Sequence, residues 1–344
     1  MKREGSGTDR RGFLRHVIEA GAGVTGAALL GGLGSGCQVR VPACKSVPPN
    51  PFVEGGRPLL VSVEGEDLTA MLQAAAEILG GFDKLRPLGR EAILKGNYVQ
   101  PQPYPVTTPA DFVVAVSRAL KRDGFTRTTL FEAQGSRLVP AFAPETGMRK
   151  VGVYDEVRRQ GVEILAGDFF ERDDYRLVRN PAWPIASPVA VHRVIHEAPV
   201  LLSLPVVKRH GAARFTCALK MHFGSVAMSD RLVAHKNERQ QGYFDQRLVH
   251  FADAAKPQLN IVDARALLAR SGPGLSAGSE IVRGVNRIVL CGDMVATDAY
   301  CARLLARHDP TFAVEMIDRQ LKHASELGLG TADLDAVKVV ERRV

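Results

Sequence analysis

From residue 59 onward, short apolar runs alternate with segments whose apolar positions recur at helical spacing. The alternation predicts strands at 59–63, 92–95, 128–132, 162–165, 189–195, 198–204, 258–262 and 287–291, and helices at 67–79, 110–122, 154–160, 215–221, 244–254, 294–307 and 311–327. Strands that alternate with helices are typical of an α/β fold with a mainly parallel sheet and helices on both faces. The pattern leaves open whether this part is one domain or two lobes around a cleft.

Residues 1–36 have a different pattern, which indicates a targeting segment. Arg10 and Arg11 precede Phe13 and Leu14, and the following stretch 17–36 is rich in Gly, Ala, Leu and Val, with Glu19 as its only charge. This arrangement resembles a twin-arginine export signal. It predicts that the export machinery is a partner and that the protein is periplasmic or extracytoplasmic. An uncleaved membrane anchor is the alternative.

Five prolines between residues 37 and 58 predict a semi-rigid linker, so the α/β domain is expected to span 59–344. The stretch 33–36 with Cys37 resembles a lipoprotein cleavage box, in which the cysteine carries the lipid. Cys37 is therefore a candidate lipid anchor, and ordinary cleavage near Gly36 is the alternative.

Composition excludes some classes of protein. The 344 residues include 45 Lys and Arg against 37 Asp and Glu, but the basic residues are scattered and there is one Trp for base stacking. This argues against nucleic-acid binding. The five cysteines form no C-x-x-C-x-x-C run, so no iron–sulfur motif is present and the cofactor stays unknown.

Polar residues follow several predicted strands, at the ends where open α/β sheets bind ligands. The residues concerned are Lys95, Asn97, Lys208, His210, Asp263 and Asp293. If all these strands are parallel, the six side chains meet at one edge of the sheet. For Asp293 an N-cap role is the alternative. Asp298, one turn further on, could face inward or outward.

Lys208 and His210 precede the segment 213–221, and Lys220 lies near its end. A helix that began there would offer its N-terminal N–H groups to an anion. Two lysines and an imidazole suit a carboxylate or a phosphate. A solvated basic face is the alternative.

Several of these stretches resemble the bacterial and archaeal family known as domain of unknown function 362. The resemblance covers about residues 90–306 and rests on the stretches 204–211, 218–224 and 292–299, with Lys95-Gly96-Asn97, Asp263 and Gly272-Pro273-Gly274. It departs from the family pattern at Met221, where the family has Asn, and at Gly96, where it has Pro. The resemblance implies a fold and a set of positions, and it implies no activity.

Together these features suggest an exported α/β protein with a ligand site formed by Lys95, Asn97, Lys208, His210, Lys220, Asp263, Asp293 and Asp298. Cations and carboxylates in one cleft suit a small anionic ligand beside a divalent metal or a general acid–base pair. A non-catalytic periplasmic binding, scaffold or metal-handling protein is the alternative, so the sequence leaves open whether the protein is an enzyme.

Overall fold

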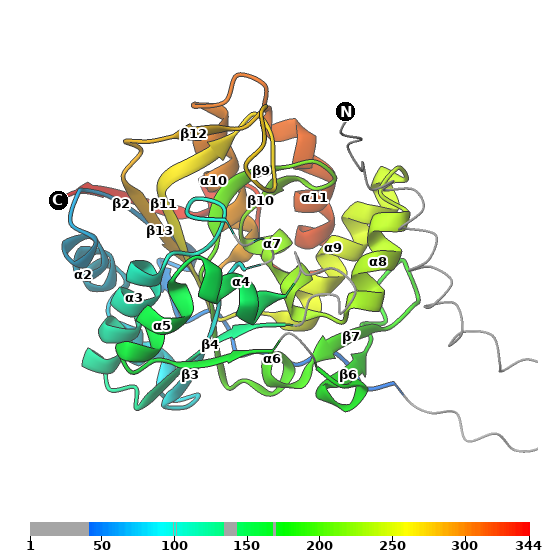
Figure 1. Cartoon of the computed structure of the whole chain (residues 1–344), viewed down its shortest axis with the longest axis horizontal. Helices are drawn as coiled ribbons and strands as arrows, with labels where there is room; N and C mark the ends of the chain where they lie inside the picture. The colour runs from blue at the N-terminus through cyan, green and yellow to red at the C-terminus, as the bar shows by residue number, and fades with distance from the viewer. Residues whose placement is uncertain (1–40, 99, 101, 134–142, 168–169) are drawn as a thin grey trace, which may run out of the picture. The chain divides into compact units, whose positions relative to one another are not determined.

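A mixed twelve-stranded sheet forms the centre of the fold (Figure 1). The computed structural model describes residues 41–98, 100, 102–133, 143–167 and 170–344. The main path of the sheet runs in the order β1-β2-β13-β11-β8-β3-β4-β5. Its strands are β1 (Val53–Glu54), β2 (Arg57–Glu64), β3 (Glu91–Lys95), β4 (Arg127–Glu132), β5 (Glu163–Ala166), β8 (Val200–Ser203), β11 (Leu259–Ala269) and β13 (Arg287–Cys291).

Further strands extend the sheet at its sides. β14 (Lys338–Arg343) pairs with β2, β12 (Glu280–Val282) and β9 (Val206–His210) pair with β11, and β10 (Arg214–Thr216) pairs with β9. A separate antiparallel pair is formed by β6 (Tyr175–Val178) and β7 (Val189–His192).

Most of the central strands are parallel, as the sequence predicts, and β13 is the exception that matters for the site. β11, β8, β3, β4 and β5 pair parallel to one another. β13 lies antiparallel to both of its neighbours, β2 and β11. The carboxyl end of β13 therefore lies at the opposite edge of the sheet from the carboxyl ends of β8, β3 and β4.

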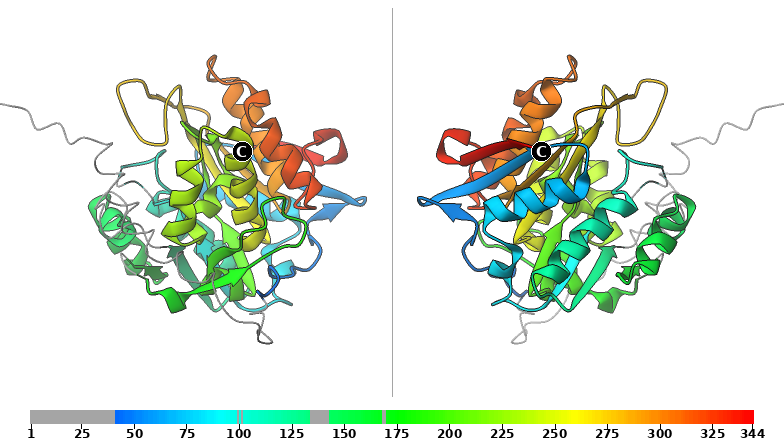
Figure 2. Two further views of the ribbon diagram at one scale, coloured as in Figure 1. Left: turned by 90° about the vertical axis from the view of Figure 1, so that its right-hand side faces the viewer. Right: turned by 90° about the vertical axis from the view of Figure 1, so that its left-hand side faces the viewer.

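Helices cover both faces of the sheet (Figure 2). Side chains alternate along a strand, so in β8 Leu201 packs on one face while Val200 and Leu202 pack on the other. One face carries α2 (Leu68–Leu79), α3 (Ala110–Arg122), α4 (Pro144–Lys150) and α5 (Val153–Arg159). The other carries α7 (Ala218–Met221), α9 (Gln241–Ala255), α10 (Met294–Ala306) and α11 (Asp318–Glu326), with α6 (Arg193–Glu197) and α8 (Met228–Lys236) beside them. The predicted α/β fold with helices on both faces is confirmed.

The domain begins earlier than the prolines predict. Residues 41–344 form one compact unit, so the described chain is not divided into two lobes. Phe52 is fully buried in the core, and β1 pairs with β2. The stretch 41–58 is therefore packed onto the domain instead of forming a separate linker, because Phe52 packs into the core. The predicted signal segment and Cys37 lie outside the described residues. No helix in the described chain is long and apolar enough to cross a membrane.

Candidate functional site

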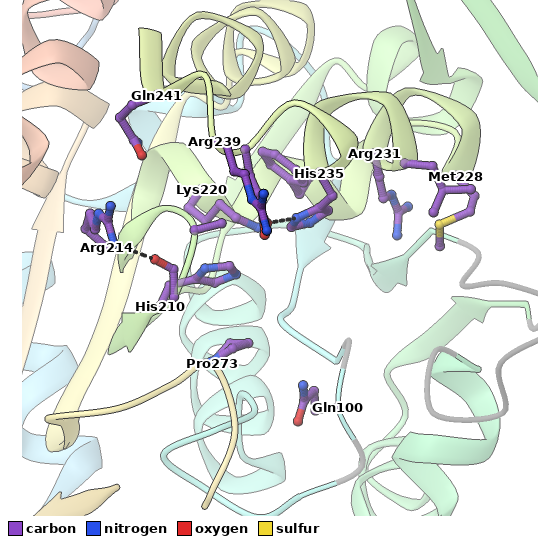
Figure 3. Close-up of a pocket in the computed structure, with 15 residues that line it drawn as sticks. Gln100, His210, Arg214, Lys220, Met228, Arg231, His235, Arg239, Gln241 and Pro273 are labelled. Atoms are coloured by element: carbon purple, nitrogen blue, oxygen red, sulfur yellow. Dashed lines mark hydrogen bonds and ion pairs between the residues drawn. The ribbon is translucent and has the colours of Figure 1, made fainter. Parts of the chain in front are cut away.

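A pocket of about 670 Å³ opens between the end of β9, the short helix α7 and the helix α8 (Figure 3). It adjoins a narrow recess of about 50 Å³, and His210, Lys220, Phe223, Gln100 and Pro273 line both spaces. We call the two together the basic pocket, because five basic side chains and only two carboxylates line it among the described residues. The basic side chains are Lys208, Arg214, Lys220, Arg231 and Arg239, and the carboxylates are Glu132 and Glu238.

Glu132, which lines the recess, belongs to a buried ion pair at the carboxyl ends of β3 and β4. The Lys95 ammonium donates to Glu132 Oε1 at 2.7 Å and to the carbonyl of Gly96 at 2.6 Å. The other Glu132 oxygen accepts the backbone N–H of Tyr98 at 2.9 Å. A side chain on Gly224 would collide with both charged groups, so glycine is required there. Both oxygens of Glu132 are thus already engaged inside the protein.

Lys208 and Asn97 line the recess beside this pair. The Lys208 ammonium donates to the carbonyl of Val106 at 2.6 Å, and burial lowers its pKa to about 7. The backbone N–H of Asn97 donates to Thr108 Oγ1 at 3.0 Å, which fixes the loop after β3. The hydroxyl of Thr216, also in the recess, is buried without a partner among the described residues. The recess therefore offers polar groups that the protein does not fully satisfy.

His210 has a defined tautomer. Its Nδ1 accepts the backbone N–H of Ala213 at 3.1 Å, so in the neutral ring the proton is on Nε2. Burial lowers the pKa of His210 well below its usual value, and the nearby Lys220 and His235 lower it further. His210 is therefore a neutral N–H donor at the wall of the basic pocket.

Lys220 is the half-buried lysine between the pocket and the recess. Its ammonium lies 3.6 Å from the centre of the Phe223 ring, and it has no hydrogen-bond acceptor in the described part of the chain. Burial lowers its pKa well below the usual value, and the charges of Lys208 and Arg231 add to this effect.

Arg231 on α8 is a site residue that sequence reasoning missed. It is 7% exposed, and its Nε donates to the carbonyl of Val226 at 2.9 Å. Its Nη2 is buried with no partner among the described residues. The neighbouring Asp230 does not supply one, because its oxygens accept from Arg247 at 2.8 Å and from the backbone of Ala190 at 2.9 Å. Figure 3 shows Arg231, Lys220 and His210 reaching into the same pocket.

The predicted helix at 215–221 is mostly wrong, and so is the expectation that its N-terminus is open to an anion. The segment forms β10 and then only a four-residue helix, α7. The N–H groups of Ala218 and Leu219 donate to the Asp298 carboxylate at 2.6 and 3.2 Å. Asp298 thus faces inward and occupies the position that an anion would take, so it positions the helix that carries Lys220.

Asp298 should make stability depend on pH. Burial raises its pKa to about 7, above its unfolded value near 3.9. The folded state therefore favours the protonated carboxyl, and its contribution to stability falls as pH rises from about 4 to about 7. From pH 5 to pH 8, wild type should lose about 3 kcal/mol of unfolding free energy relative to Asp298→Asn. Urea unfolding of both proteins at each pH measures this difference. A difference that does not change with pH would show that this carboxyl titrates normally.

Besides Asp298, two of the predicted residues lie away from the basic pocket. Asp263 is fully buried in β11, accepts the Tyr104 hydroxyl at 2.8 Å and pairs with Arg265 at 2.8 Å. Asp293 caps α10 by accepting the backbone N–H groups of Val295 and Ala296, and it lines a different hollow beside residues 46–51. The expectation that Asp293 shares one sheet edge with Lys208 and His210 is wrong, because β13 runs antiparallel to β11.

The structure thus brings together Lys95, Asn97, Lys208, His210 and Lys220, and adds Glu132 and Arg231. Glu132 is the last residue of β4, so the rule of strand ends applies to it as well. Arg231 is on a helix, and no pattern of strand ends points to it. Among the described residues no group of three or more His, Cys, Asp or Glu could hold a metal ion.

The family model described as "Domain of unknown function (DUF362)" matches residues 93–303, more than half of the chain. No curated protein matches the sequence. Among solved structures, the lactate racemase apoprotein from Thermoanaerobacterium thermosaccharolyticum is 14% identical, with a TM-score of 0.42 over 72% of this chain and 59% of that one. A protein from Thermotoga maritima is 11% identical, with a TM-score of 0.38 over 69% and 53%. The chain spans less than two thirds of either protein.

Proposed function

We propose that this chain, which belongs to the DUF362 family, binds a small anionic ligand in the basic pocket. The observation that carries the proposal is the buried Nη2 of Arg231, which has no acceptor among the described residues. Burial lowers the pKa of Arg231, but a guanidinium keeps its charge at physiological pH. The carboxylates near it, Asp230 and Glu132, are already engaged by Arg247 and Lys95, so a bound anion would complete this site.

The shape and lining of the basic pocket support a small organic anion. A volume of about 670 Å³ falls within the usual range for small-molecule sites. Phe223, Met228 and Leu232 supply apolar walls, while Arg231 and the Nε2–H of His210 supply donors. Lys208 is only 3% exposed, so this cation is not part of a solvated basic face.

Isothermal titration calorimetry tests the proposal. Malonate and phosphate serve as anionic probes, and glycerol serves as the uncharged control. We expect saturable binding of at least one anion at one site and none of glycerol. Two flat anion titrations would contradict the proposal.

We also propose that residues 1–36 export the chain by the twin-arginine route and that Cys37 anchors it through a lipid. The support is the pair Arg10 and Arg11 before a Gly- and Ala-rich run. Replacing both arginines by Lys should leave the precursor in the cytoplasm, as cell fractionation would show. Unchanged export would exclude this route.

In the same precursor, Cys37→Ser should release the exported protein from the membrane fraction. A variant with unchanged attachment and mass would exclude this anchor.

A further inference from the structure

The Lys220 amine has an environment different from that of the other lysines around the basic pocket. Lys95 is paired with Glu132, and Lys208 donates to the carbonyl of Val106. Lys220 is half-buried, lies against the Phe223 ring and has no acceptor among the described residues. We propose that Lys220 is a nucleophile that forms an imine with a small carboxylate bearing an aldehyde or ketone group. This inference rests on the proposed anion site.

The charges around Lys220 favour its neutral amine, the form that attacks a carbonyl. Lys208, Arg231 and Lys95 all lower its pKa, and Glu132, itself paired with Lys95, opposes them. His210 and His235 also line the pocket, and burial lowers the pKa of both, so both rings are neutral at pH 7. The other carboxylate of the pocket, Glu238, lies 3.4 Å from His235 Nδ1. An unpaired lysine near other cations in a partly apolar pocket is a known way to obtain an amine nucleophile.

The pocket provides separate groups for the two ends of such a compound. Arg231 keeps its charge while Lys220 is neutral, so the guanidinium can hold the carboxylate. The Nε2–H of His210 can donate to the carbonyl oxygen, because its Nδ1 is occupied by the N–H of Ala213. Lys220 and His210 line both the pocket and the recess, and Arg231 lines the pocket.

The reaction needs no oxidant and no metal. The nitrogen lone pair of Lys220 forms a bond to the carbonyl carbon, and the C=O π electrons move to oxygen. The nitrogen loses one proton, and the oxygen gains one to become a hydroxyl. A second proton from solvent converts this hydroxyl to water, the C–O bond breaks, and a protonated imine remains. The sum is amine plus carbonyl plus one proton, giving iminium plus water.

Trapping with a reductant tests this inference. The full chain is incubated with glyoxylate and sodium cyanoborohydride at pH 7.4, and the reduced adduct is located by peptide mass spectrometry. Glyoxylate bound in the pocket is held beside the Lys220 amine, whereas Lys236, an exposed lysine on α8, meets glyoxylate only from bulk solution. We therefore expect modification of Lys220 to exceed that of Lys236 by about tenfold or more. Lys220→Arg should abolish the site-specific adduct, and Lys236→Arg should leave it unchanged.

Malonate separates this inference from the proposed function, because it is an anion without an aldehyde or ketone. If both are right, malonate binds to wild type and to Lys220→Arg, and it suppresses the glyoxylate adduct. Malonate binding with no preferential adduct on Lys220 would overturn the imine and leave the anion site standing. If malonate does not bind and glyoxylate forms no preferential adduct on Lys220, both the anion site and the imine are overturned. Thermal melts of Lys220→Arg and Lys220→Met check folding, and an adduct that persists at another lysine in a folded variant would also refute the assignment.

Discussion

Glu132→Gln should lower the free energy of unfolding by about 3 kcal/mol or more, because breaking a buried ion pair leaves an uncompensated charge. The side chains of Lys95 and Glu132 are each 1% exposed and 2.7 Å apart. Burial lowers the pKa of Lys95, and Glu132 is the group that opposes this shift. Without the carboxylate, Lys95 must lose its proton or remain charged in the core. Urea unfolding at pH 7 measures the effect.

The same two strands offer a matched control. Glu91 on β3 pairs with Arg127 on β4, but these side chains are 55% and 50% exposed. Glu91→Gln should cost less than about 1 kcal/mol. The double variant Lys95→Met with Glu132→Leu should recover much of the loss, since an apolar pair removes the buried charges together. Equal effects of Glu132→Gln and Glu91→Gln would contradict this description of the pair.

Arg231→Met should weaken malonate binding by about thirtyfold or more, because removing one partner of a buried charge pair costs about 2 kcal/mol or more. The methionine fills similar space but loses the charge and the Nη2 donor that has no partner among the described residues. Arg231→Lys keeps the charge without the planar fork and should fall between wild type and Arg231→Met. Titration calorimetry of the three proteins with malonate measures the order of their affinities.

Arg239 provides the control for this substitution, because it lines the same pocket but is exposed. Arg239→Met should change the affinity by less than about fivefold, as expected for a solvated charge. Thermal melts check that each variant is folded, since Arg231 also donates to the carbonyl of Val226. A folded Arg231→Met protein with the affinity of wild type would contradict the assigned role.

Elements with a strong apolar period were predicted well. The helix expected at 110–122 has the observed bounds of α3, and the strand expected at 287–291 has those of β13. The helix expected at 67–79 is α2, with Asp67 as its N-cap. In such segments the buried positions repeat at the period of the element, so the local sequence carries the information.

Strand direction was harder to predict, and it decides which residues meet. The link from β11 to β13 contains β12 and turns but no helix, and a link without a crossover helix readily returns the chain antiparallel. The stretch 270–286 has no helical pattern in the sequence. The absence of this pattern would have predicted an antiparallel β13, with Asp293 at the opposite edge of the sheet from Lys208. Arg231 could not be found in this way, because its position in the pocket depends on how α8 packs against α9.

Anion binding in the basic pocket is tested most directly by a crystal structure of the full chain grown with selenate, with data collected at the selenium absorption edge. We expect an anomalous peak in the basic pocket within hydrogen-bond distance of Arg231 Nη2 or Lys220 Nζ. Peaks only at exposed arginines such as Arg303 and Arg307, with none in the basic pocket, would contradict the proposed anion site.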